Sequence, residues 1–97
     1  MRKSDKKIEN LIRDVLTDVC EETLKSYDGF LWVTHIVKHA SFPQSLKIIC
    51  VFETNQDRAH FLMGDGQQHV STAIQVAFSK VGVQLKNVSK QISYETK

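Results

Sequence analysis

The sequence predicts a single α+β domain, in which helices pack on one face of a small mixed sheet to form two layers. The main observation is the order of the hydrophobic patterns: a long amphipathic helix, two strands, two helices separated by a glycine-rich turn, and a last strand. The length of 97 residues suits one domain, and 41% hydrophobic with 25% charged residues is typical of a globular protein. We therefore expect an α-β-β-α-α-β domain over residues 1–97, with residues 1–5 flexible.

The first predicted element is a long amphipathic helix. Its apolar residues recur at helical spacing through four turns, so they form one stripe along the helix. Ser4 or Asp5 can cap its start, and the Asp28-Gly29 turn ends the segment. The stripe consists of Ile8, Leu11, Ile12, Val15, Leu16, Val19 and Leu24.

Two strands are predicted next. Residues 30–37 are rich in β-branched and aromatic side chains, residues 40–45 form a connection, and residues 46–53 form the second strand. One face of the second strand carries Leu46, Ile48, Cys50 and Phe52, and the other carries Lys47, Ile49, Val51 and Glu53. Because this second face is partly apolar, we expect a second copy or a partner to cover the outer face of the sheet. Scattered exposed apolar groups, which are normal on protein surfaces, are the alternative.

Two helices follow, separated by a glycine-rich turn. Thr54 and Asp57 form a capping-box pattern before a short helix over residues 58–63. Gly64-Asp65-Gly66 is interpreted as a plain turn in which Asp65 caps the next helix; the alternative is a phosphate held by backbone N–H groups. Gly82 lies where a left-handed residue ends a helix. The stripe of this second helix is Val70, Ile74, Ala77, Phe78 and Val81.

The last element is a strand that ends near Tyr94. Val83 and Leu85 alternate in one phase, whereas Val88 and Ile92 follow the other phase with Tyr94. The change of phase near Asn87 predicts a bulge or a lead-in loop before the strand itself.

Charge is unevenly distributed along the chain. The formal net charge is +2, but residues 1–7 carry +3, residues 8–65 carry −4 and residues 66–97 carry +3. Basic ends are suited to nucleic acid, although they are also common as solvated tails.

No motif indicates catalysis or metal binding. His35 and His39 are four residues apart, which on a strand separates their Cα atoms by about 13 Å, too far for one ion. No G-x-S-x-G elbow is present, and each cysteine lies in a predicted apolar face, where a thiol is inert. The repeated carboxylates Asp14, Asp18 and Glu22 are typical of a solvated helix face. We expect a non-enzymatic protein without a metal or cofactor.

The composition also bears on location. No apolar segment follows the charged start, and no run approaches the ~18 apolar residues of a membrane helix. The two cysteines do not make a disulfide framework. These observations favour a cytoplasmic protein with no membrane partner.

Several short patterns resemble ribosome-binding factor A, a family with a type II KH-like domain. They are Ile8-x-x-Leu11-Ile12-x-x-Val15-Leu16, Gly29-Phe30-x-x-Val33-Thr34, Leu46-Lys47-Ile48 and the stretch from Asn87 to Tyr94. The resemblance implies the α-β-β-α-α-β fold and an association with the small ribosomal subunit and its RNA. The G-x-x-G loop of KH domains has no counterpart here, because Gly64 and Gly66 are two residues apart.

A second resemblance is to small proteobacterial proteins, some described as Fis-type transcriptional regulators. It rests on Asp18-Val19-Cys20-Glu21, Asp28-Gly29-Phe30-x-Trp32 and Ser45-Leu46-Lys47-Ile48. It implies a role in transcriptional regulation. Such regulators end in a helix-turn-helix, whereas a strand is predicted at this end of the sequence.

Two functions remain open on the sequence. The leading one is a nucleic-acid- or ribosome-associated domain whose partner is ribosomal RNA or the small ribosomal subunit. Its predicted phosphate contacts are Arg2, Lys3, Lys6, Lys7, Lys80, Lys86 and Lys90. The alternative is a protein-interaction module that docks a partner or forms a homodimer through the outer sheet face. Its predicted interface consists of Trp32, Ile49 and Val51.

Overall fold

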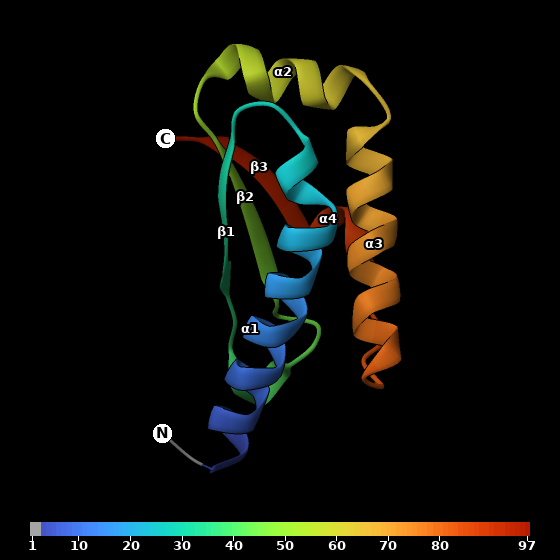
Figure 1. The fold of residues 1–97 in the computed structure, drawn as a ribbon. Coiled ribbons are helices and arrows are strands. Elements are labelled where there is room, and N and C mark those ends of the chain that lie inside the picture. Colours follow the sequence, from blue (N-terminus) through green and yellow to red (C-terminus); the bar gives the residue numbers. More distant parts are fainter. Residues whose placement is uncertain (1–2) are drawn as a thin grey trace.

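The computed structural model of the protein describes residues 3–97, and the side chains of residues 5–97. The helices and strands follow the predicted order except for one additional short helix before the last strand, so the α+β fold class is confirmed (Figure 1). Two 3₁₀ turns, Leu24–Ser26 and His39–Ser41, lie in the connections. The elements are α1 (Lys3–Glu22), β1 (Phe30–Ile36), β2 (Lys47–Phe52), α2 (Asn55–Met63), α3 (Gly66–Lys80), α4 (Val88–Gln91) and β3 (Ile92–Thr96).

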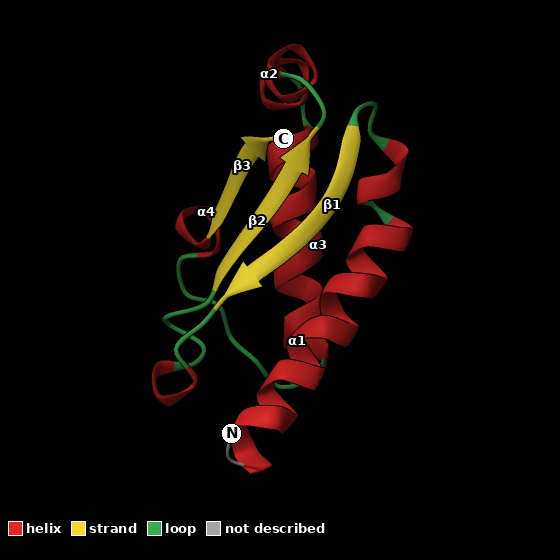
Figure 2. Cartoon of the chain, turned by 90° about the vertical axis from the view of Figure 1, so that its left-hand side faces the viewer, coloured by secondary structure: helices red, strands yellow, loops and turns green. Residues whose placement is uncertain are grey.

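The three strands form one mixed sheet in the order β1-β2-β3. β1 pairs with β2 antiparallel, and β2 pairs with β3 parallel. A parallel pair needs a long crossover, which α2, α3 and α4 supply here. Helices α1 and α3 lie on one side of the sheet, whereas no helix stands in front of the other side in Figure 2. This arrangement confirms the two-layer prediction.

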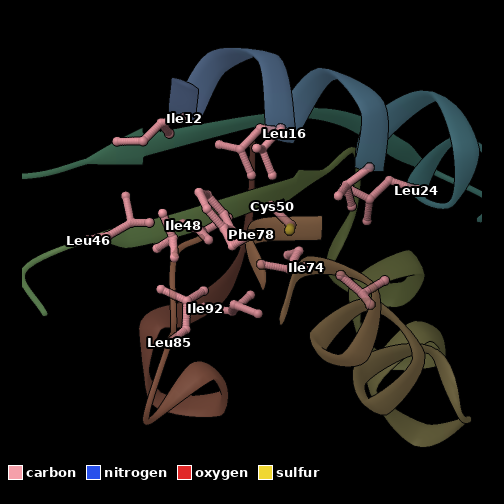
Figure 3. Close-up of a cluster of buried hydrophobic side chains, with 14 of the residues drawn as sticks. Ile12, Leu16, Leu24, Leu46, Ile48, Cys50, Ile74, Phe78, Leu85 and Ile92 are labelled. Atoms are coloured by element: carbon pink, nitrogen blue, oxygen red, sulfur yellow. The ribbon is translucent and has the colours of Figure 1, made fainter. Parts of the chain in front are cut away.

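The core lies between the inner face of the sheet and these two helices. Ile48, Cys50 and Phe52 of β2 all have an exposed fraction of 0%, which confirms the predicted alternation of this strand. Fully burying a large apolar side chain contributes roughly 1.5–3 kcal/mol, so β2 is a main source of stability. Figure 3 shows Ile48 and Cys50 of β2 close to α1 and α3. Their partners in the core include Ile12, Leu16, Ile74, Phe78, Leu85 and Ile92.

Helix α1 differs from its prediction at both ends. It begins at Lys3, so Ser4 and Asp5 lie inside the first turn instead of capping it. A carboxylate in the first turn still interacts favourably with the helix dipole. The helix ends at Glu22, and Leu24 belongs to a separate 3₁₀ turn in which it is fully buried. Gly29, with φ of +79°, then reverses the chain into β1.

The start of α2 confirms the predicted cap at Thr54. The Thr54 Oγ1 accepts a hydrogen bond from the Asp57 backbone N–H at 3.1 Å, and its hydroxyl donates to the Asp57 carboxylate at 2.9 Å. The helix begins at Asn55, three residues earlier than expected. The predicted cap at Asp65 is wrong, because its side chain makes no capping hydrogen bond. Its backbone is helical (φ −81°, ψ −1°), whereas a capping residue is typically extended.

The left-handed residue predicted at Gly82 is confirmed, and the structure shows that it closes α3 in a Schellman motif. Gly82 has φ of +82°; its N–H donates to the Ser79 carbonyl, and the Val83 N–H donates to that of Phe78. The chain beyond it differs from the prediction. Val83 and Leu85 are buried in a loop. They alternate because both side chains pack on the core, and they do not form a strand. The change of phase marks a lead-in through α4, and β3 begins only at Ile92.

The two glycines at helix ends provide a matched test of backbone strain. We predict that Gly82→Ala lowers the free energy of unfolding by about 1 kcal/mol, because a Cβ is unfavourable at positive φ even in open space. Gly64→Ala is the control: φ is −97°, and the nearest heavy atom to an added Cβ is 3.9 Å away. We expect this variant to keep its stability or gain up to ~1 kcal/mol. Denaturant unfolding measures both, and an equal loss in both variants would contradict the assignment.

Candidate nucleic-acid interface

The topology brings basic segments that are distant in sequence to one end of the molecule. The last residue of β1, Ile36, pairs with the first residue of β2, Lys47, so the connection between them lies at this end. Figure 1 shows the start of α1 at the same end. Lys6, Lys7 and Lys38 are exposed in these segments. We call this region the basic end.

A hollow at the basic end is lined by lysines and by no acidic residue. It has a volume of about 440 Å³ and lies between the β1–β2 connection and the segment that contains α4. Its charged lining residues are Lys47, Lys86 and Lys90. Because no carboxylate shares the lining, their charges add and create a site that attracts anions. The other lining residues are Pro43, Gln44, Ser45, Leu46, Gln84, Asn87 and Gln91.

Hydrogen bonds hold the walls of this basic hollow together. The Gln91 side-chain amide donates to the carbonyls of Pro43 at 2.9 Å and Leu46 at 3.1 Å, which joins α4 to the β1–β2 connection. The Ser45 hydroxyl donates to the Lys38 carbonyl at 2.7 Å and accepts from the Lys38 N–H at 3.0 Å. These bonds close the connection and keep Lys38 beside the hollow. The bonds of Gln91 therefore anchor the backbone next to Lys47 and Lys90.

The predicted phosphate contacts are only partly brought together. Lys86 and Lys90 share the hollow, as expected, and Lys47 joins them although the sequence prediction omitted it. Lys80 does not join them, because it lines a groove between α1 and α3 together with the carboxylates Asp18 and Glu22. Among the other predicted contacts, Lys6 and Lys7 are exposed in the first turn of α1, Arg2 lies outside the described residues, and only the backbone of Lys3 is described.

The opposite end of the molecule is acidic. A hollow of about 320 Å³ there is lined by Asp28, Asp57 and Asp65, together with the turn glycines Gly64 and Gly66. Three carboxylates around this turn oppose a bound phosphate through like-charge repulsion. The surroundings thus favour the plain-turn interpretation of the glycines over the phosphate-binding one.

A carboxylate joined to two histidines links α1 to the sheet at the basic end. The Nε2 of His35 is 2.9 Å from Oε2 of Glu9, and the Nε2 of His39 is 2.8 Å from Oε1 of the same side chain. We call these three residues the His–Glu–His clasp. The strand spacing on which the sequence-based separation of the two histidines rested does not apply, because β1 ends at Ile36 and His39 lies in a 3₁₀ turn. The sequence analysis did not identify Glu9 as a site residue.

The clasp is partly shielded from water. The side chains of His35, His39 and Glu9 are 16%, 22% and 21% exposed. The pKa of Glu9 is lowered from its ordinary value of 4.5, chiefly by the hydrogen bond with His39 and then by that with His35. The folded protein therefore holds this carboxylate as an anion more firmly than the unfolded chain does.

Nucleophilic and metal chemistry find little support in the described part of the chain. Cys50 is 0% exposed, and burial raises the pKa of its thiol to about 12, so it is inert. Cys20 is half-buried in α1. Within residues 3–97, no group of three or more His, Cys, Asp or Glu side chains is arranged to hold a metal ion.

The predicted interface residues share the outer face of the sheet. Trp32 of β1 pairs with Val51 of β2, and Ile49 lies two residues before Val51 on the same strand. Trp32 is 47% exposed, while Val51 is 7% exposed yet lies outside the buried core cluster. By register, these residues share the outer face of the sheet, and Trp32 also lines a hollow of about 430 Å³ at the β1 edge together with Arg13 and Glu21 of α1.

Comparison with known proteins yields no relative: no family model, no curated protein and no solved structure matches the chain. Across residues 3–97, no helix combines the length and the apolar composition needed to cross a membrane.

The clasp leads to a prediction about stability and pH. We expect Glu9→Gln to lower the free energy of unfolding by about 1 kcal/mol at pH 7, because the partly exposed carboxylate loses charge-assisted hydrogen bonds. The pKa of Glu9 is lower in the folded state, so its contribution is present above pH 4.5 and disappears as the pH falls through the lowered value. Unfolding by denaturant at several pH values measures the difference. Glu21→Gln, on an exposed position of the same helix, is the control; a Glu9→Gln effect that persists unchanged at pH 3 would contradict the prediction.

Proposed function

We propose that this protein is a non-enzymatic RNA-binding domain that holds phosphate groups in the basic hollow. The observation that carries the proposal is the convergence of Lys47, Lys86 and Lys90 on one hollow without an acidic lining residue. Two segments of the chain that are distant in sequence, residues 43–47 and 84–91, supply the wall, so the hollow depends on the fold. Lys6, Lys7 and Lys38 extend positive charge beyond it at the same end.

Phosphate is the ligand that this chemistry favours. Lysine ammonium groups act as mobile point charges that suit the varied positions of a phosphate backbone. Each phosphate that a lysine neutralises releases counterions, which supplies much of the affinity of nucleic-acid binding. The side-chain amides of Gln84 and Asn87 in the lining offer hydrogen bonds for a sugar or a base edge.

The shape of the site favours RNA over duplex DNA. Reading the major groove of DNA commonly uses a helix that presents basic side chains. The exposed face of α1 carries Asp14, Asp18 and Glu21 instead, and these would repel phosphates. A hollow of this size is within the range of sites for small groups, about 300–1,000 Å³, and suits one nucleotide of a single strand or loop. The geometry therefore gives no support to a helix-turn-helix regulator.

The resemblance to ribosome-binding factor A supports ribosomal RNA as the natural target. The patterns behind that resemblance include Leu46-Lys47-Ile48 and the stretch from Asn87 to Tyr94. Both segments contribute to the wall of the basic hollow. The proposed partner is therefore an exposed segment of RNA on the small ribosomal subunit.

Salt dependence and charge reversal test the hollow directly. Three phosphate contacts to single-stranded RNA predict a slope of about −2 in log affinity against log salt, or ~20-fold weaker binding at 200 mM than at 50 mM. We expect the double variant Lys86→Glu/Lys90→Glu to lose at least ~100-fold in affinity and most of this slope. Fluorescence anisotropy with a labelled RNA oligonucleotide measures both quantities.

The control keeps the same change of net charge at another place. Lys25→Glu/Lys97→Glu alters two exposed lysines that do not line the basic hollow. We expect this double variant to lose less than ~5-fold, as a general charge effect. Equal losses in the two double variants would contradict a site in the hollow.

Co-sedimentation with small ribosomal subunits tests the proposed partner. We expect association at low salt that weakens at moderate salt and is lost in the Lys86→Glu/Lys90→Glu variant. If the protein binds the oligonucleotide but never sediments with the subunit, the ribosomal partner is wrong while the RNA-binding site stands.

A further inference from the structure

The outer face of the sheet is open and partly apolar. No helix stands before it in Figure 2. Its side chains alternate with the buried ones of β1, β2 and β3, as the period of two requires. Trp32 is 47% exposed and Ile36 is 61% exposed, so two large apolar side chains on the outward side of one strand, separated by Thr34, are open to solvent. The outward positions are Trp32, Thr34, Ile36, Lys47, Ile49, Val51, Ser93 and Glu95.

The charges on this face are segregated along the strands. Lys47 lies at the end where β2 begins, and Glu95 pairs with Val51 at the end where β2 finishes. Trp32 also pairs with Val51, so the exposed indole lies toward the end that carries the carboxylate. A carboxylate there disfavours a nucleic-acid backbone, so stacking of an RNA base on Trp32 is not the best use of this face. A protein surface suits it better.

The face is complementary to itself about a two-fold axis. Thr34, Ile49 and Ser93 are cross-strand neighbours and form its central row. Trp32 and Ile36 are two residues before and after Thr34, just as Lys47 and Val51 are two residues before and after Ile49. A two-fold axis along the central row therefore places Trp32 of one copy over Ile36 of the other. It also places Lys47 of one copy over Val51 of the other, beside Glu95.

We propose that a second copy of this chain binds the outer face, with the two sheets stacked and their strands antiparallel. Charge selects this orientation. A two-fold axis parallel to the strands would instead place Lys47 of one copy over Lys47 of the other, and Trp32 of one copy over Glu95 of the other. Like charges would then face each other, and an indole would lie on a carboxylate. The antiparallel stack instead pairs opposite charges at both ends around an apolar centre at Ile49. Sheets stacked with aligned strands are a common packing.

The size of the face predicts a reversible dimer. Three strands spaced about 4.8 Å apart and about 20 Å long cover less than the ~800 Å² that each partner buries in a standard interface. The proposal does not rest on RNA binding, although Lys47 borders both the outer face and the basic hollow. The two activities are separable, because Ile49 and Glu95 do not line the hollow.

Sedimentation velocity and tryptophan fluorescence test the dimer on the purified chain. From about 10 µM to 1 mM, we expect the mass to move from one chain toward two, the range suited to a small interface. Trp32 is the only tryptophan, so its emission should shift to shorter wavelength as association buries the indole. A mass of one chain across this whole range would overturn the proposal.

Variants locate the interface. We expect Ile49→Asp to weaken association at least tenfold, while Val76→Asp leaves it unchanged, because Val76 is a 48% exposed apolar residue on α3, away from the sheet. Circular dichroism and the melting temperature check that each variant folds. If both variants weaken association equally, the contact is not through the sheet.

A charge swap tests the orientation independently of folding. Both Lys47 and Glu95 are exposed. We expect Lys47→Glu and Glu95→Lys each to weaken association severalfold, because like charges then meet across the interface. An equimolar mixture of the two variants should restore it, since each copy then offers the charge that the other lacks. Failure of the mixture to associate would overturn the antiparallel arrangement.

Discussion

The structure depends on the one-sided burial of the central strand β2. It is hydrogen-bonded on both edges, and its inner side chains Ile48, Cys50 and Phe52 are all 0% exposed. That face can be covered only if α1 and α3 both pack on it, which sets the two-layer arrangement and the crossover to β3. The outer face is left without a helix as a direct consequence. Trp32 and Ile36 on that face therefore stay 47% and 61% exposed in the single chain, whereas Val51 is already buried.

The same topology separates the charges. Strand β1 returns the chain to the end of the molecule from which α1 starts, and β2 begins there. The segment before β3 returns to this end as well. Lys47, Lys86 and Lys90 line the basic hollow and the lysines at the start of α1 lie at the same end, whereas the aspartates near the glycine turn gather at the opposite end. One end of the molecule is therefore basic and the other acidic. This separation favours a polyanion at one end and, on the outer face, an antiparallel neighbour.

Local patterns predicted the fold well and the site only in part. The stripes of α1 and α3, the alternation of β2 and the ends at Thr54 and Gly82 depend on neighbours within a few residues, so the sequence shows them. The hollow depends on contacts between residues more than 40 positions apart, such as Gln91 with Pro43, and no periodicity reports these. For this reason the sequence did not show that Lys47 lines the hollow, and it wrongly placed Lys80 with Lys86 and Lys90. Glu9 was missed because two distant histidines define its role.

The most direct test of the account is to map RNA contacts on the backbone amides by nuclear magnetic resonance during titration with a short single-stranded RNA. The account predicts that the largest chemical-shift changes fall on Ser45, Lys47 and residues 84–91, which form the wall of the basic hollow. The amides of residues 55–66, at the acidic end, should not change. Changes centred on the glycine turn, or spread evenly over the surface, would contradict the assignment of the hollow as the binding site.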